Sequence, residues 1–97
     1  MNNVLRKSAQ NQQCFVRLPG VCSFNPEQTV LAHLPSGYKG LKSHDLFGSF
    51  CCYECHQVLD GHKQSLFTKE YLQLSHLQGV IRTQEHWIRE GLIKIIG

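Results

Sequence analysis

The sequence predicts a small α+β domain whose core is cross-linked by a bound metal ion and followed by a C-terminal helix that packs against it. The chain has 97 residues, enough for one domain with only a small hydrophobic core. Five Cys and six His are a large share of it, and a metal ion is a common second source of stability at this size. Short β-prone runs punctuated by glycine and proline fill the first half, and one long helical pattern fills the second.

We expect residues 1–97 to form one domain in three parts. Residues 1–13 are polar and predict an N-terminal arm, residues 14–62 a metal-binding core, and residues 68–91 a C-terminal helix. No apolar run approaches the length of a membrane span, and the N-terminus lacks the apolar core of a signal peptide. A cytoplasmic protein without membrane contacts is therefore expected.

The core predicts three short strands. Residues 15–18 are apolar and end at a Pro-Gly turn, which predicts a strand with a tight return. Residues 29–33 and 46–50 are β-prone and should pair with each other across a basic, glycine-containing loop at 35–42.

Two helices should follow the strands. Residues 52–59 predict a short helix that ends at Asp60 and Gly61. Thr68 can cap a longer helix over 69–90, with Gly91 as its stop. An apolar stripe on this helix is expected to pack against the core: Leu74, Leu77, Ile81 and Ile88. The apolar tail 92–96 could add a strand or form a homodimer contact.

The cysteine spacing favours a four-sulfur metal site. Cys52 and Cys55 are separated by two residues, so one turn can bring both sulfurs to the same Zn²⁺. Cys14 and Cys22 flank the predicted turn and could complete the site. Cys51 is then left over and should point away as a buried apolar residue. Two alternatives stay open: Cys14 and Cys22 pack in the core while Cys52 and Cys55 form a redox dithiol, or a histidine replaces one cysteine ligand.

A second group of residues suits hydrolytic chemistry. His56 and Asp60 lie four apart on the predicted helix, so both could hold one divalent cation. His62 follows as a further candidate ligand. His33 ends a predicted strand and could deprotonate a water molecule. The alternatives are a half-buried structural histidine at 33, a helix-stop residue at 60 and a solvated loop residue at 62.

The net charge of +3 lies in the first half of the chain. Residues 1–47 contain five basic residues against two acidic ones, and the remainder is balanced. A basic half of this kind favours a polyanionic partner, with DNA phosphates as the expected contacts. The candidate phosphate-binding residues are Arg6, Lys7, Arg17, Lys39 and Lys42.

At this point the motifs resemble a known family. The order Leu31-Ala32-His33, a loop, Asp45-Leu46 and then Cys52-Tyr53-Glu54-Cys55-His56 resembles the ββα-metal core of HNH endonucleases. More narrowly, these motifs, together with Arg6-Lys7-Ser8-Ala9, Cys14 and Pro19-Gly20-Val21-Cys22, resemble the YbcO-like prophage nuclease family. The resemblance covers about two-thirds of the chain, up to Asp60-Gly61.

The resemblance implies a role for each matching residue. His33 would be the general base, and Asp45, where the motif usually carries Asn, would fix it or its loop. His56 would bind the catalytic Mg²⁺ or Mn²⁺, with Asp60 or His62 as a second ligand. The cysteines would hold a separate structural Zn²⁺. Ala32 departs from the motif, because HNH enzymes often carry an acidic metal ligand there.

The function expected from these observations is metal-dependent hydrolysis of DNA phosphodiester bonds by a protein of phage or prophage origin. Two alternatives remain at this stage. One is a non-catalytic zinc module that binds DNA or a protein, and the other is a thiol redox protein.

Overall fold

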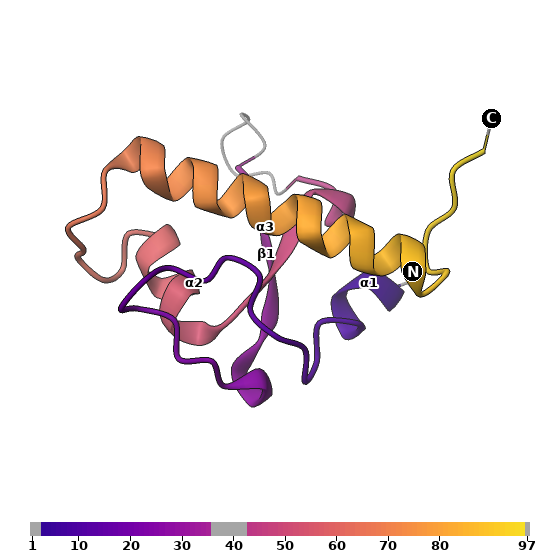
Figure 1. The fold of residues 1–97 in the computed structure, drawn as a ribbon, viewed down its shortest axis with the longest axis horizontal. Helices are drawn as coiled ribbons and strands as arrows, with labels where there is room; N and C mark the ends of the chain where they lie inside the picture. The colour runs from indigo at the N-terminus through magenta and orange to yellow at the C-terminus, as the bar shows by residue number, and fades with distance from the viewer. Residues whose placement is uncertain (1–2, 36–42, 97) are drawn as a thin grey trace.

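The computed structural model describes residues 3–35 and 43–96, and it shows a β-hairpin with helices packed around it (Figure 1). The long helix α3 lies across the hairpin, with α2 near its N-terminal half and α1 near its C-terminal end. This arrangement confirms the small α+β class. The elements are α1 (Val4–Lys7), η1 (Pro26–Gln28), β1 (Val30–His33), η2 (Asp45–Phe47), β2 (Gly48–Cys51), α2 (Tyr53–Leu59) and α3 (Lys69–Arg89).

The predicted pairing of the two central strands is confirmed. β1 and β2 run antiparallel, with Ala32 opposite Ser49 and His33 opposite Gly48. The second strand begins two residues later than expected, because residues 45–47 form the 3₁₀ turn η2. His44 caps this turn by accepting a hydrogen bond at Nδ1 from the backbone N–H of Leu46, at 3.0 Å.

Both predicted helices form, and each begins at a side-chain cap. The Cys52 side chain accepts a hydrogen bond from Cys55 at the start of α2, and Asp60 is the C-cap. Thr68 Oγ1 accepts from the backbone N–H of Tyr71 at 3.1 Å at the start of α3. Gly91 follows α3 with a φ of 74°, a left-handed conformation that glycine adopts without the steric cost of a Cβ.

The predicted apolar stripe of α3 is wrong. Its members face solvent, with exposed fractions of 53%, 47%, 53% and 44%, for Leu74, Leu77, Ile81 and Ile88 respectively. The helix instead buries Ser75, His76, Gly79, Val80, Thr83 and Trp87. Gly79 explains this choice, because a Cβ there would collide with the Ser49 side chain. At Gly79, α3 therefore approaches β2 too closely for a large side chain, whereas the larger Val80 and Trp87 are buried elsewhere on the same helix.

The predicted strand at residues 15–18 is also wrong. Within the described residues, this segment forms no ladder and contacts β2 through one backbone hydrogen bond, from Phe15 N–H to Phe50 O at 2.8 Å. Arg17 has a φ of 53°, which is incompatible with an extended strand. Arg82 on α3 fixes the segment by donating from Nη1 to Phe15 O at 2.6 Å.

Two small groups of buried residues form the core. One surrounds the cysteines and contains Cys14, Val16, Leu18, Ala32, Cys51, Cys52, Cys55 and Val58. The other contains Ala9, Phe50 and Trp87, and the Trp87 indole N–H donates to Ser8 Oγ at 2.7 Å to tie the N-terminal segment to α3. In the tail, Ile95 and Ile96 are exposed, so its role in a homodimer stays a prediction.

Candidate metal centre and active-site cavity

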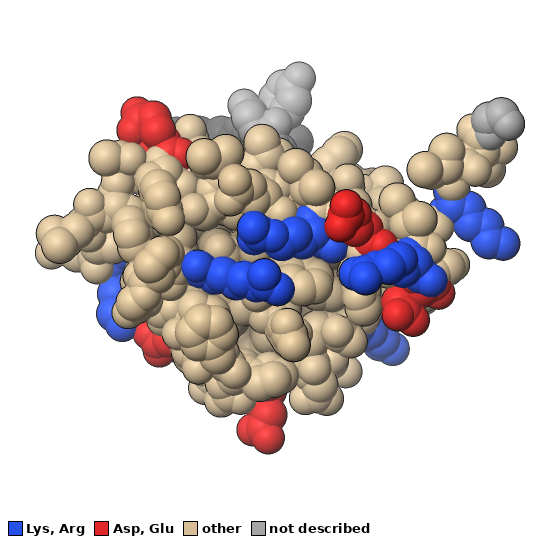
Figure 2. All heavy atoms as spheres, in the orientation of Figure 1, with Lys and Arg blue, Asp and Glu red and all other residues tan. Residues whose placement is uncertain are grey.

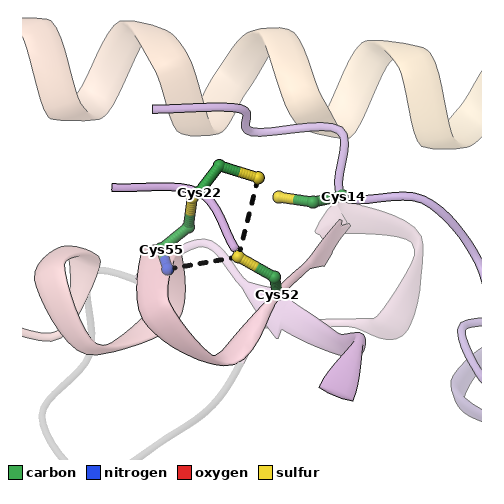
Figure 3. A group of neighbouring side chains, drawn as sticks. All are labelled: Cys14, Cys22, Cys52 and Cys55. Atoms are coloured by element: carbon green, nitrogen blue, oxygen red, sulfur yellow. Dashed lines mark hydrogen bonds between the residues drawn. The ribbon is translucent and has the colours of Figure 1, made fainter. Parts of the chain in front are cut away.

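Four cysteines from distant parts of the chain converge on one point (Figure 3). All sulfurs of Cys14, Cys22, Cys52 and Cys55 lie within 4.8 Å of one another, and Sγ of Cys22 and Cys52 are 3.8 Å apart. A tetrahedral ion with metal–sulfur bonds of about 2.3 Å would separate its sulfurs by roughly 3.8 Å. The cluster therefore has the size of a four-sulfur metal site, as the spacing predicted.

Backbone N–H groups already donate to the sulfurs. Arg17 N–H donates to Cys14 Sγ at 3.5 Å, and Cys55 N–H donates to Cys52 Sγ at 3.4 Å (the latter is drawn in Figure 3). The N–H of Arg17 points back at Cys14, and the positive φ of Arg17 turns the chain that follows out of an extended conformation, so no strand forms here. Such donors stabilise sulfur as a thiolate, the form that binds metal.

The pKa values of the thiols also depend on hydrogen bonds between the cysteines. Hydrogen bonds from Cys51 and Cys55 lower the pKa of Cys14 far below its usual range. The Cys55 pKa is raised, chiefly by its hydrogen bond to Cys14, and burial raises the pKa of Cys22 to about 12. A dication would allow all four sulfurs to ionise.

Cys51 does not point away from this cluster. It is fully buried, and its thiol hydrogen-bonds to Cys14 and Cys55, which raises its own pKa. The alternation expected of a strand fails here because β2 ends at Cys51 and Cys52 already caps α2. Cys51 is a fifth sulfur beside the four ligand candidates, not one of them.

A separate cavity of about 640 Å³ brings together residues from β1, α2 and α1. Among its lining residues are His33, His56, Asp60 and Arg6. The sequence predicts that His33, His56 and Asp60 form a hydrolytic site and that Arg6 binds a DNA phosphate. Gln10 and Thr29 also line the cavity, and no sequence motif had marked them.

His33 is held in the cavity wall by Asp45. His33 Nε2 lies 2.7 Å from Asp45 Oδ1, and the two side chains are only 14% and 19% exposed. Arg6 Nε donates to the same oxygen at 3.2 Å. The hydrogen bond from His33, and then the Arg6 guanidinium, hold the pKa of the Asp45 carboxyl below its usual range. An ionised Asp45 accepts Nε2–H, so the lone pair of a neutral His33 is on Nδ1.

His56 and Asp60 form the second half of the cavity site. His56 Nε2 and Asp60 Oδ2 are 3.1 Å apart across one turn of α2. Adjacent ligands of an octahedral Mg²⁺ would be separated by about 3.0 Å, so both atoms could bind one ion. Asp60 is also the C-cap of α2, so the helix-stop interpretation of this residue holds as well.

The remaining predicted site residues lie elsewhere. His62 is exposed beyond α2 and does not line the cavity. Among the described residues, only the four cysteines form a group of three or more potential ligands, so His56 and Asp60 are joined by no third one. Lys7 is exposed on α1, and Arg17 Nε donates to Cys14 O at 3.1 Å. Lys39 and Lys42 lie outside the described residues.

Charge is mixed on the face of the molecule that carries α3. Figure 2 shows Lys and Arg side chains in a band along this helix, with acidic side chains between them. This face therefore does not present a uniformly positive surface to a polyanion. In the described part of the chain, no helix is long and apolar enough to cross a bilayer.

The fold and these two sites together define a small α+β protein with a four-cysteine cluster that could hold a metal ion, and with a separate cavity lined by His and Asp residues. A sequence model described as "Putative nuclease YbcO" matches residues 3–92. The chain belongs to this family.

Relatives of known name agree with this assignment. "Putative nuclease YbcO" of Escherichia coli (strain K12) is 41% identical over 93 residues, covering 93% of this chain and 96% of that protein. "Putative nuclease ybcO" of Enterobacteria phage 82 matches to the same extent. Among solved structures, one described as "Structure of a putative bacteriophage protein from Escherichia coli str. K-12 substr. MG1655" superimposes with a TM-score of 0.79. It is 38% identical and covers 91% of this chain and 100% of that chain.

Proposed function

We propose that this protein is a metal-dependent DNA endonuclease of the HNH type, with a ββα-metal core built from β1, β2 and α2. The observation that carries the proposal is the shared cavity, which is lined by His33, His56 and Asp60. Asp45 contacts His33 at 2.7 Å from outside this lining, and His56 Nε2 lies 3.1 Å from Asp60 Oδ2. The names of the relatives support a nuclease. The relative from a phage supports a phage or prophage origin. Action on DNA in the bacterial cytoplasm is part of the proposal.

In this proposal His33 is the general base. Asp45 accepts Nε2–H at 2.7 Å and holds the imidazole in one tautomer, so Nδ1 takes a proton from the attacking water. The resulting hydroxide attacks phosphorus, and one P–O ester bond breaks. Arg6 already uses Nε on Asp45, and its terminal amino groups are suited to a non-bridging phosphate oxygen in the same cavity.

His56 and Asp60 would hold the catalytic Mg²⁺ or Mn²⁺, with water completing its coordination and His62 as a further candidate ligand. When bound, this ion would polarise the scissile phosphate and stabilise the leaving oxygen. The four cysteines would hold a structural Zn²⁺, because four thiolates are a typical donor set of such sites. That ion would join the N-terminal segment to the start of α2.

A plasmid-nicking assay with Mg²⁺ or Mn²⁺ tests this function. Wild type should convert supercoiled plasmid to nicked circles, and His33→Ala should lower the rate about 100-fold or more. His62→Ala in the same series decides whether His62 is a ligand, because loss of a ligand raises the metal concentration needed for activity. If wild type and His33→Ala are equally inactive, or equally active, His33 is not the base of a nuclease.

A second candidate function is a non-catalytic zinc module that binds DNA or a protein. The observation that favours it is the small ligand set at the cavity, since Ala32 supplies no carboxylate and, of the residues that the structure describes, only the candidate ligands His56 and Asp60 come together there. One metal ion per chain, with DNA binding but no nicking, would support this module. Two metal ions per chain would support the nuclease, and none would favour the redox alternative.

A further inference from the structure

Two side chains of α3 contact the backbone immediately beside the proposed catalytic pair. His76 Nε2 lies 2.8 Å from the carbonyl oxygen of Ala32, the residue before His33. Gln84 Nε2 lies 2.6 Å from the carbonyl oxygen of Leu46, the residue after Asp45. Each member of the His33–Asp45 pair thus has a neighbour whose carbonyl is anchored to the same helix.

The contact made by His76 is buried and well defined. His76 is only 7% exposed, and its partner is a carbonyl oxygen, which can only accept. Burial lowers the pKa of His76, so the ring is neutral and donates through Nε2–H.

A rigid helix can fix the relative position of two segments that it contacts at separate points. Residues 76 and 84 lie about 12 Å apart along an α-helix. The strand ladder pairs His33 with Gly48 and sets the register of β1 against β2. Asp45, however, lies in η2 outside that ladder, and Gln84 links η2 directly to α3 through its hydrogen bond to Leu46 O.

We infer that His76 and Gln84 are positioning residues that hold the His33–Asp45 pair in its productive geometry from the helix side of the sheet. The inference rests on the proposed nuclease function. Its consequence is catalytic because a shift of about 1 Å in a reacting group can reduce a rate roughly 100-fold.

α3 offers a matched control at Thr83. Its hydroxyl accepts a hydrogen bond from the backbone N–H of Phe50 at 3.0 Å and is fully buried. Phe50 is in β2, and it is adjacent to neither His33 nor Asp45. Thr83→Val therefore removes a buried bond between α3 and the sheet without touching the carbonyls beside the catalytic pair.

The test compares steady-state nicking by Gln84→Leu, His76→Leu, His76→Gln and Thr83→Val. Gln84→Leu and His76→Leu should lower kcat by about 10- to 100-fold with little change in KM, because only the orientation of the base is lost. His76→Gln keeps an N–H donor of similar reach and should restore most of kcat. Thr83→Val should lower the melting temperature and leave kcat within about twofold of wild type.

Nitrogen NMR of the histidine rings separates this inference from the nuclease proposal. In wild type, the hydrogen bond to Asp45 should protect the His33 Nε2 proton from exchange with water, whether or not the protein cuts DNA. That protection should fall in Gln84→Leu and His76→Leu and persist in Thr83→Val. A His33 signal unchanged in all variants, or a kcat that follows melting temperature through Thr83→Val, would overturn the inference. If His76→Leu does not fold, the test is made with Gln84→Leu alone, because Gln84 is only partly buried.

Discussion

Replacing Cys52 and, separately, its neighbour Cys51 separates a metal ligand from a buried cysteine of the same size. Both residues are fully buried, and they are adjacent in the chain. Only Cys52 belongs to the four sulfurs that lie within 4.8 Å of one another. We expect Cys52→Ala to lose the proposed zinc and Cys51→Ala to keep it.

The size of the difference follows from the contacts of each side chain. Truncating either residue removes one buried sulfur, at a cost of about 1 kcal/mol. Cys52→Ala also removes the N-cap of α2, at about 1 kcal/mol. A four-ligand zinc site contributes roughly 10–16 kcal/mol, so one ligand accounts for about 3 kcal/mol, or a roughly 100-fold weaker site. The free energy of unfolding of Cys52→Ala should therefore be lower than that of Cys51→Ala by about 4 kcal/mol.

Two measurements on the purified variants check this prediction. Elemental analysis gives zinc per chain, and competition with a coloured chelator gives the relative affinity. Urea unfolding with zinc present gives the stability difference. Equal zinc content and equal unfolding midpoints for the two variants would show that the four-sulfur cluster is not a metal site.

Three further predictions concern the cavity. Asp60→Asn should raise the Mg²⁺ or Mn²⁺ concentration needed for half-maximal nicking about tenfold. The control Glu54→Gln, on the same helix but paired with Lys63 at 2.9 Å, should leave this concentration unchanged. An equal rise in both variants would show that Asp60 is not a metal ligand. A carbon NMR titration of the Asp45 carboxyl should give a midpoint below about 3.9, which rises more in His33→Ala than in Arg6→Ala. Because folding lowers this pKa, ionised Asp45 contributes to the free energy of unfolding at any pH above the ordinary Asp pKa. The contribution is lost as the pH falls through the lowered pKa of the folded protein. A midpoint at the ordinary Asp value would refute the pairing of Asp45 with His33 and Arg6. Arg6→Gln should weaken DNA binding and reduce the slope of log affinity against log salt concentration by about 1. Arg89→Gln, at a residue that does not line the cavity, is the control. Equal slopes for wild type and Arg6→Gln would exclude a phosphate contact by Arg6.

Local patterns in the sequence were sufficient for much of the fold. β-prone runs on either side of a glycine-containing loop located the β-hairpin. Thr68 and Gly91 marked the limits of α3, because caps act within one helical turn. The orientation of α3 could not be predicted in this way. Its buried face mixes small and polar residues with Val80 and Trp87, and its orientation depends on the close approach of Gly79 to Ser49, 30 residues away in the sequence.

The sites show the same division between local and long-range information. Cys52 and Cys55, like His56 and Asp60, were found because one helical turn brings each pair together. The failed strand at 15–18 has a local cause that no propensity encodes, since Arg17 adopts a positive φ and its N–H donates to Cys14 Sγ. His76 was missed because its partner is a backbone carbonyl 44 residues away, and no side-chain pattern marks such an acceptor.

Anomalous diffraction from crystals grown with Mn²⁺, recorded at the zinc and manganese absorption edges, tests the central claim most directly. The nuclease proposal predicts zinc at the centre of Cys14, Cys22, Cys52 and Cys55, and manganese bound to His56 and Asp60 on the side of the cavity that His33 faces. Manganese absent from the cavity, or His33 turned away from the bound ion, would contradict it.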